Sequence, residues 1–191
     1  MSETDEYILD AITSMVWSGF YTADDVDVMI DDLLEEDADE ELLRAAVEPE
    51  FARKAEAEKT WPAVTDCDRL DQAFAALDAR GIIALHNAGL TMSDGLTEVF
   101  EVQERRGRDR GKGYCFYHGQ DLDRAVAGAG LLIAFGAVDD NEVDNTEIGR
   151  TVRDVLRSFG LTVEWNGTPT SRLNLFPLDW KRRGPAFEES A

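Results

Sequence analysis

The sequence contains few cysteines and histidines, and it has no long apolar run. Its 191 residues include two cysteines, two histidines and five prolines. Cys67 and Cys115 lie in unlike contexts, so they indicate neither a CxxC site nor a disulfide framework. The start of the chain has no basic stretch followed by an apolar one, and no run approaches the ~20 apolar residues that cross a bilayer. We therefore expect a cytoplasmic protein.

Positive charge is also scarce. Forty acidic side chains stand against nineteen basic ones, which gives a net charge of −21, and nineteen acidic against only four basic residues precede Trp61. Such a surface repels nucleic-acid phosphate and anionic lipid, which excludes direct DNA binding and membrane binding. A basic protein is the partner that this charge favours. The alternative is that the excess charge serves solubility or a salt-adapted cytoplasm.

A complete set of catalytic or metal-ligating residues is missing as well. The sequence has no HxH or HExxH motif, no P-loop lysine and no GxGxxG spacing. Cys67 is flanked by Asp66 and Asp68, which disfavour a thiolate, and Cys115 belongs to an apolar strand pattern. We therefore expect no cofactor, no metal and a role that is not enzymatic.

What the sequence does contain is an apolar run at residues 130–138, GLLIAFGAV, which is typical of a strand buried on both faces. Helical patterns at 122–129 and 148–159 flank it, and residues 82–86 and 114–117 predict two more strands. Alternating residues at 161–166 and 172–175 predict an antiparallel hairpin at a sheet edge. The fold class is α/β (or α+β), with a mixed, mostly parallel sheet of about five strands that ends in this hairpin.

The helix pattern before residue 130 decides the topology. If this helix is long enough to cross over, the strands that it joins are parallel. If it is too short, the architecture becomes a two-layer, ferredoxin-like arrangement.

Residues 1–62 predict an acidic, all-helical segment, and residues 63–191 predict the α/β domain. Three apolar stripes at helical spacing support the front segment, with Pro49 expected to break or kink the third. The stripes consist of Ile8, Ile12, Met15 and Val16, then Val26, Met29, Ile30, Leu33 and Leu34, then Leu42, Leu43, Ala46 and Val47. We expect the tail after Lys181 to be mobile.

The two histidines follow the first and second apolar strands of the α/β domain. Ligands gather at the carboxyl ends of parallel strands, so His86 and His118 are candidate acid–base groups, with Asp121 orienting one of them. The loop HNAGLTMSDG and the start of the next helix add candidate ligand-binding residues, which are Asn87, Thr91, Ser93 and Gln120. The simpler interpretation is that strand ends collect polar residues in any sheet and that Ser93 caps a helix.

Two further groups of residues suggest interaction surfaces. Trp165 and Trp180 lie at or near the edge hairpin, where they either cover the sheet edge or anchor a protein interface. Basic residues concentrate in one loop and recur near the C-terminus, and we expect them to pair with the acidic front segment. They are Arg105, Arg106, Arg108, Arg110 and Lys112, then Lys181, Arg182 and Arg183.

Several motifs also carry a resemblance to a family. The runs WPAVTDCDRLDQAF, GIIALHNAGLTMSDG, GYCFYHGQDLDRAV and LLIAFGAV, with the closing LTVEWNG, resemble an uncharacterised bacterial domain family of unknown function over nearly the whole chain. That resemblance implies no activity and transfers no catalytic residue. The acidic character and the helix–strand–WNG ending are similar, over part of the chain, to the ribonuclease E inhibitor B family of small acidic proteins, which regulate by binding an enzyme.

The sequence thus favours a non-enzymatic regulatory or protein-interaction module. The alternative is a small enzyme or a ligand- or metal-binding domain, with a pocket at the strand ends around His86 and His118.

Overall fold

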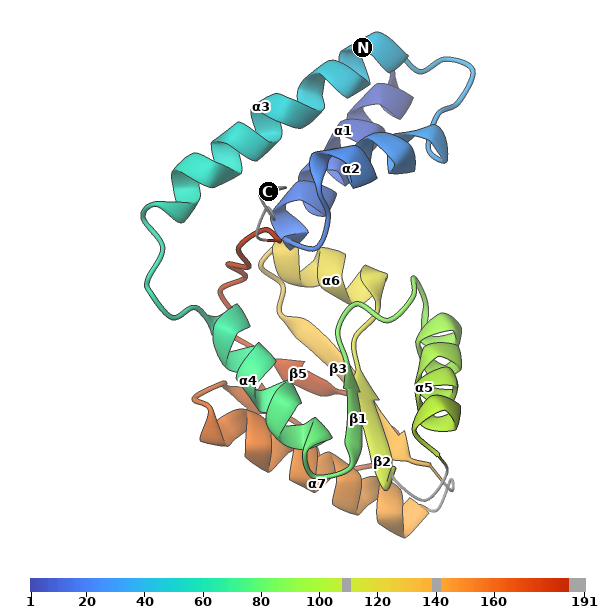
Figure 1. Cartoon of the computed structure of the whole chain (residues 1–191), viewed down its shortest axis with the longest axis vertical. Helices are drawn as coiled ribbons and strands as arrows, with labels where there is room; N and C mark the ends of the chain where they lie inside the picture. Colours follow the sequence, from blue (N-terminus) through green and yellow to red (C-terminus); the bar gives the residue numbers. More distant parts are fainter. Residues whose placement is uncertain (108–110, 139–141, 186–191) are drawn as a thin grey trace, which may run out of the picture. The chain divides into compact units, whose positions relative to one another are not determined.

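The computed structural model describes residues 1–107, 111–138 and 142–185, except for the side chains at 142–144. It divides the chain into two compact units (Figure 1). The helical unit consists of Met1–Thr65 together with the described part of Lys181–Ala191, and the α/β unit consists of Asp66–Trp180. The chain therefore passes from one unit to the other twice.

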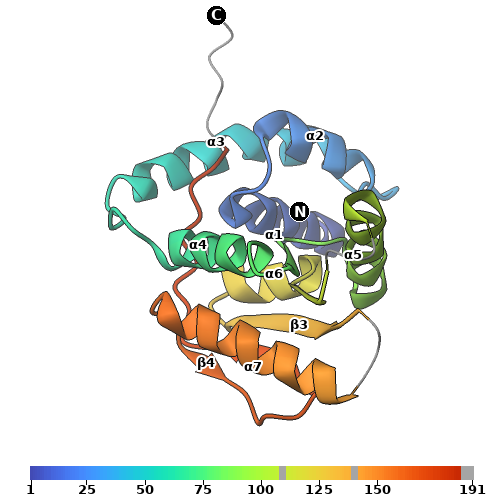
Figure 2. The same ribbon diagram turned by 60° about the horizontal axis from the view of Figure 1, so that its bottom comes forward.

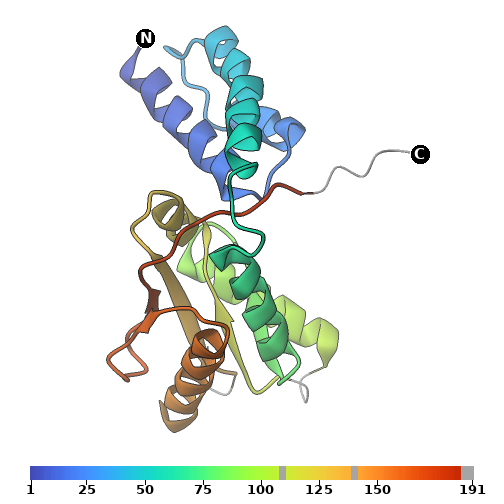
Figure 3. The same cartoon turned by 90° about the vertical axis from the view of Figure 1, so that its left-hand side faces the viewer.

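The helical unit contains α1 (Glu3–Ser18), α2 (Ala23–Asp31) and α3 (Glu40–Glu58) (Figure 3). Capping boxes begin the first two helices. The hydroxyls of Ser2 and Thr22 each accept a hydrogen bond from the backbone N–H of an aspartate three residues later, and the backbone N–H of each capping residue donates to the carboxylate of that aspartate. The backbone N–H groups of Asp39 and Ser2 donate to Asp5 and hold the pKa of its carboxyl below the usual value. Asp5 thereby links the first turns of α1 and α3.

The core of this unit is formed by the predicted stripes, because each helix turns its apolar face inward. The buried members are Ile8, Ile12, Met15, Val16, Val26, Ile30, Leu43 and Val47. Leu42, which belongs to the third predicted stripe, is instead 37% exposed. Pro49 lies inside α3, which continues to Glu58, so of the two expected outcomes, a break or a kink, the break was wrong.

The α/β unit begins with α4 (Asp66–Asp78), β1 (Ile82–Leu85), α5 (Met92–Arg106) and β2 (Gly113–Phe116). It continues with α6 (Gly119–Val126), β3 (Leu131–Ala137) and α7 (Glu142–Ser158), and ends with β4 (Val163–Glu164) and β5 (Leu173–Leu175). The five strands form one mixed sheet in the order β1-β2-β3-β5-β4. The apolar run at 130–138 therefore provides the central strand, and β4 and β5 form the predicted antiparallel hairpin.

The expectation of mostly parallel pairing was wrong. Only β1 and β2 are parallel, and they are joined through the 15-residue helix α5. β3 runs antiparallel to both β2 and β5. The reason is the length of α6. Its eight residues are too few to carry the chain back to the end of the sheet at which β2 begins, as a parallel β3 would require. The unit therefore belongs to the α+β class.

Helices cover both faces of this sheet, so the two-layer alternative was also wrong. An added Cβ at Gly149 of α7 would lie 2.5 Å from Phe135, and one at Gly95 of α5 would lie 2.3 Å from Phe116. Phe135 pairs with Cys115, the residue before Phe116, and successive strand residues point to opposite faces. Figure 2 shows α7 extended along β3 and β4.

Two observations concern the membrane and the thiols. Among the described residues, no helix has the length and apolar composition of a membrane span. Both cysteines are free and buried, and burial raises the pKa of the Cys115 thiol far above its usual value. Cys115 is therefore a protonated core side chain.

Candidate functional site

His86 follows β1 directly and lies among residues of α4 and the end of β2. Its ring stacks on Phe74 with centroids 4.4 Å apart, and its Nδ1 lies 3.0 Å from the Tyr117 hydroxyl. Its Nε2 lies 3.4 Å from a carboxylate oxygen of Asp71. Because Tyr117 is fully buried, the imidazole supplies a hydrogen-bond partner that the phenol requires inside the core.

His118 precedes α6 and forms a second, more deeply buried polar cluster. Its Nε2 lies 3.0 Å from Oδ2 of Asp121, whose two oxygens also accept hydrogen bonds of 2.8 and 2.9 Å from Nη1 of Arg172. His118 is 4% exposed and Asp121 is 3% exposed. The carboxylate thus lies between an imidazole and a guanidinium, as a buried charge requires. Nδ1 of His118 has no hydrogen-bond partner among the described residues.

The two histidines follow neighbouring parallel strands, but each has its own carboxylate partner. His86 pairs with Asp71 of α4, whereas His118 pairs with Asp121 of α6. Tyr117, which contacts His86, is the residue before His118, and successive side chains of an extended segment point in opposite directions. The described residues contain no group of three His, Cys, Asp or Glu side chains arranged to hold a metal ion.

The loop after His86 is organised by a helix cap. Thr91 is the N-cap of α5, so the expectation that Ser93 caps this helix was wrong. Asp94 accepts hydrogen bonds from the hydroxyl and the backbone N–H of Thr91, which lower the pKa of its carboxyl. This carboxylate occupies the helix start where an external anion would bind. Asn87 adopts a left-handed φ of 46°, and Gln120 is exposed.

Both candidate interface tryptophans pack within the α/β unit. The Trp165 indole N–H donates to the backbone oxygens of Thr168 and Ser171. Its ring meets Phe135 edge-on at 5.4 Å. Trp180 is largely buried and meets Tyr117 edge-on at 6.0 Å. These contacts hold the hairpin and the last turn of the unit against the sheet.

Three residues of these clusters were not predicted as site residues, namely Asp71, Tyr117 and Arg172. Each is distant in sequence from the histidine that it contacts, and Tyr117 was predicted only as the last residue of the second strand. A signal for Arg172 exists only once β5 is known to pair with β3, because that pairing brings it beside α6. Arg108 and Arg110 of the predicted basic loop lie outside the described residues, and Arg106 pairs with Asp78.

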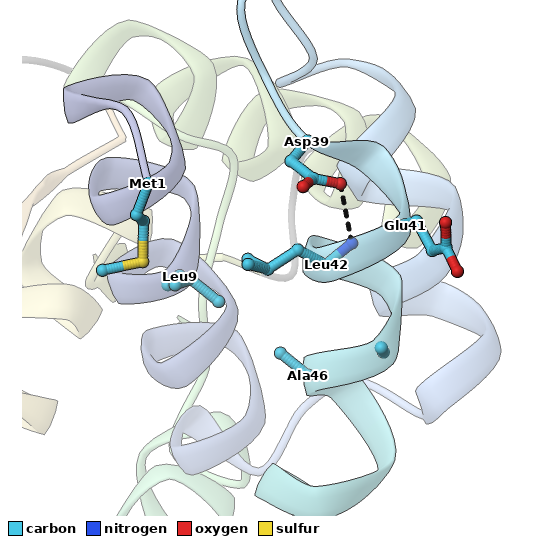
Figure 4. A pocket seen from close by; sticks show the side chains of 7 residues that line it. Met1, Leu9, Asp39, Glu41, Leu42 and Ala46 are labelled. Carbon is cyan, nitrogen blue, oxygen red and sulfur yellow. Dashed lines mark hydrogen bonds between the residues drawn. The ribbon is translucent and has the colours of Figure 1, made fainter.

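The helical unit carries a groove of about 600 Å³ between α1 and α3, which we call the α1–α3 groove (Figure 4). Leu42 and Ala46 project from α3 toward Leu9 and Met1 on the opposite wall. The remaining lining residues are Asp39, Glu41 and Ala45. Asp39 accepts a hydrogen bond from the Leu42 backbone as the cap of α3. The groove therefore has an apolar floor with the Asp39 carboxylate at one end, and the Glu41 side chain extends from the other side of α3 (Figure 4).

A second groove, of about 800 Å³, lies where the start of α2 meets the C-terminal half of α3, and we call it the α2–α3 groove. One face of α3 supplies Phe51, Ala52 and Ala55. The charged lining residues include Asp24, Glu48, Glu58, Lys54 and Arg183. Lys54 is only 3% exposed and lies 3.6 Å from Glu58.

The basic side chains of α3 and of its C-cap, Lys59, are engaged within the helical unit. They are the four that precede Trp61, and each forms an ion pair with an acidic residue nearby. The Arg44 guanidinium contacts both Asp31 and Glu40 and also donates to the backbone oxygen of Asp27. These contacts join α2 to α3. Four cations cannot neutralise nineteen carboxylates, so this unit keeps a strong negative potential.

Residues 181–184, which we call the C-terminal basic segment, contact this acidic unit, although we expected the tail to be mobile. The Arg182 guanidinium lies 4.5 Å above the Phe20 ring centroid, within cation–π range. Arg183 donates to the backbone oxygen of Pro62 at 2.8 Å. The Gly184 N–H donates to Glu58 at 3.4 Å.

The comparisons with known proteins identify the family. The chain belongs to the family described as Domain of unknown function (DUF6891), whose model matches residues 1–184. The comparison with curated proteins found no match, and the comparison with solved structures found none.

Proposed function

We propose that this chain is a cytoplasmic, non-enzymatic interaction module whose helical unit binds a basic segment of another protein. The observation that carries the proposal is the α1–α3 groove, where an exposed leucine, Leu42, lines an apolar floor beside Asp39 and Glu41. Free, buried cysteines are also what a reducing compartment favours.

The chemistry of the groove defines the partner. An apolar side chain that removes the floor from water gains roughly 25 cal/mol for each Å² of apolar surface buried. Lysine or arginine beside that side chain is attracted by the surplus carboxylates of the unit, which accelerates association and selects against acidic partners. The occupant is therefore a segment in which apolar and basic residues are interleaved.

Site-specific photo-crosslinking tests this proposal. A benzophenone amino acid replaces Leu42 in the groove, and in a matched control it replaces Phe100, which is 52% exposed on α5 of the α/β unit. We expect the groove position to crosslink, in extract from the native cell, to Lys- and Arg-rich segments that mass spectrometry assigns to one or a few proteins. The proposal is contradicted if the control position yields the same segments, or if the groove position yields acidic ones.

A second candidate function is ligand binding at the buried polar cluster of His118, Asp121 and Arg172, and one observation favours it. Nδ1 of His118 is buried without a hydrogen-bond partner among the described residues, next to the Asp121–Arg172 pair. Metal analysis of the purified protein tests it, together with a thermal-shift screen of divalent metals and small anions on wild type, His118→Ala and His86→Ala. A ligand whose stabilisation disappears in His118→Ala supports this candidate. No metal and no shift with any compound removes it.

A further inference from the structure

The C-terminal basic segment shows how the helical unit recognises basic residues, since it is a cationic stretch already bound to that unit. We infer that a partner protein presents an Arg-Arg-Gly segment to this same surface, and that residues 181–184 are an internal competitor for it. The inference rests on the proposed binding of basic segments by the helical unit, and it adds a binding surface that shares no residue with the α1–α3 groove. Lys181, Arg182 and Arg183 add three positive charges to a unit in which acids outnumber bases by nineteen to four before Trp61.

Arg182, Arg183 and Gly184 each contact a group that matches their chemistry. The first arginine, Arg182, is held by the Phe20 ring and passes over Gly19, where an added Cβ would lie 2.6 Å from the Arg182 backbone oxygen. Gly19 also ends α1 with a left-handed φ of 78°, which only glycine adopts readily. Glycine is therefore required at this position both by its own backbone conformation and by the close approach of the segment. Without a Cβ, the surface at Gly19 has room for a peptide backbone.

The second arginine and the glycine are read by polar groups. Arg183 donates to the Pro62 backbone oxygen, and the Gly184 N–H donates to the Glu58 carboxylate. The same carboxylate lies near Lys54, which helps to fix its position. These contacts recognise a guanidinium and a backbone N–H, so they do not depend on the rest of the chain that presents them.

The α2–α3 groove continues from this segment, because Arg183, Gly184 and Pro185 form part of its lining. A partner segment that follows the same path would reach the apolar surface of Phe51, Ala52 and Ala55 with its next side chains. In the internal segment the residue after Arg-Arg-Gly is Pro185, which lines this groove, so an apolar residue at the same position suits a partner segment.

Competition by a tethered segment lowers the apparent affinity of a partner. A site occupied in cis binds an external ligand only in the fraction of molecules whose segment is released. Weakening the internal segment should therefore strengthen external binding, which is the opposite of what a purely structural contact predicts.

The test uses the full chain and a fluorescent peptide with the sequence of residues 179–186, followed by fluorescence anisotropy. We expect Arg182→Ala/Arg183→Ala to bind this peptide about tenfold or more tightly than wild type. Phe20→Leu in that background keeps an apolar side chain but removes the aromatic face, and should weaken binding several-fold. Tyr7→Leu, an exposed aromatic of the same unit, is the matched control and should change nothing.

Three results would overturn the inference. They are equal affinity of wild type and the double variant, equal affinity for a peptide of scrambled sequence, and a concentration-dependent dimer of wild type that the double variant does not form, which would make a second copy the occupant. Thermal unfolding and circular dichroism of each variant separate lost binding from lost folding. If basic segments still crosslink at Leu42 while the peptide fails, this inference is wrong and the proposed function stands.

Discussion

At the scale of single residues, the acidic side chains of this protein fall into three groups. Some cap helices, some form ion pairs, and the rest exceed the number of basic side chains. Asp5, Asp25 and Asp94 accept N-terminal hydrogen bonds of their helices, and Asp121 is enclosed by His118 and Arg172. The capping boxes at Thr22 and Thr91 join residues three positions apart, so they depend on local sequence alone, although Ser93 rather than Thr91 was expected to cap α5. The contact of Arg172 with Asp121 does not follow from local rules, because it depends on strand order rather than on neighbouring residues.

The capping box of α2 predicts a pH-dependent stability. The backbone N–H and the hydroxyl of Thr22 donate to Asp25 and lower the pKa of its carboxyl from the usual 3.8. A lowered folded-state pKa stabilises the fold above the unfolded-state value, and this contribution is lost as the pH falls through the folded-state pKa. In urea unfolding, wild type should exceed Asp25→Ala in stability at neutral pH, and the difference should shrink below pH 3.8. Asp24→Ala is the control, and a pH-independent difference for Asp25→Ala would contradict the argument.

The buried carboxylate of α6 predicts a large effect from a small change. Asp121→Asn leaves the Arg172 guanidinium without its counter-charge, and it should reduce the free energy of unfolding by about 2 kcal/mol. This expected loss of stability is moderate for a buried ion pair because the Arg172 side chain is 34% exposed. Asp123→Asn, at an exposed position of the same helix, should change stability by less than about 0.5 kcal/mol. Chemical denaturation measures both, and equal effects would show that the cluster contributes little.

At the scale of elements, the strand positions and the three front helices follow from apolar periodicity alone. The run at 130–138 is the central strand because it is apolar on both faces, as its sequence indicates. The direction of pairing did not follow, since it depends on whether α6 spans the sheet, and eight residues do not. Leu42 marks another limit, because helical spacing places it on the buried stripe while α1 leaves it exposed in a groove.

Gly95 lies where α5 approaches the sheet closely, so we expect alanine at this position to destabilise the protein rather than to stabilise the helix. An added Cβ at Gly95 would lie 2.3 Å from Phe116. Alanine normally stabilises a helix relative to glycine by up to about 1 kcal/mol, but overpacking costs about 1–3 kcal/mol, so Gly95→Ala should destabilise the protein. Ser93→Ala, at an exposed position of the same helix, should be close to neutral. Guanidinium unfolding decides the sign, and a more stable Gly95→Ala would mean that α5 and β2 separate easily.

At the scale of the whole molecule, acidic self-repulsion is the dominant long-range interaction. The net charge of −21 is concentrated where the helical unit has nineteen acids and four bases before Trp61. Salt screens like charges, so the melting temperature should rise between about 20 and about 500 mM NaCl. Differential scanning calorimetry measures this, and a melting temperature that falls with salt would indicate that ion pairs outweigh the repulsion.

The account depends most on selective binding of basic segments by the helical unit. The most direct measurement is the dissociation constant of a labelled peptide that interleaves leucine and arginine, titrated with the full chain at low salt. We predict that Ala46→Arg in the α1–α3 groove weakens binding about tenfold or more, as does replacing the peptide's arginines with glutamine, while Ala75→Arg, at an exposed position of α4, has a clearly smaller effect. Equal affinities for the arginine and glutamine peptides, or equal losses in the two variants, would contradict it.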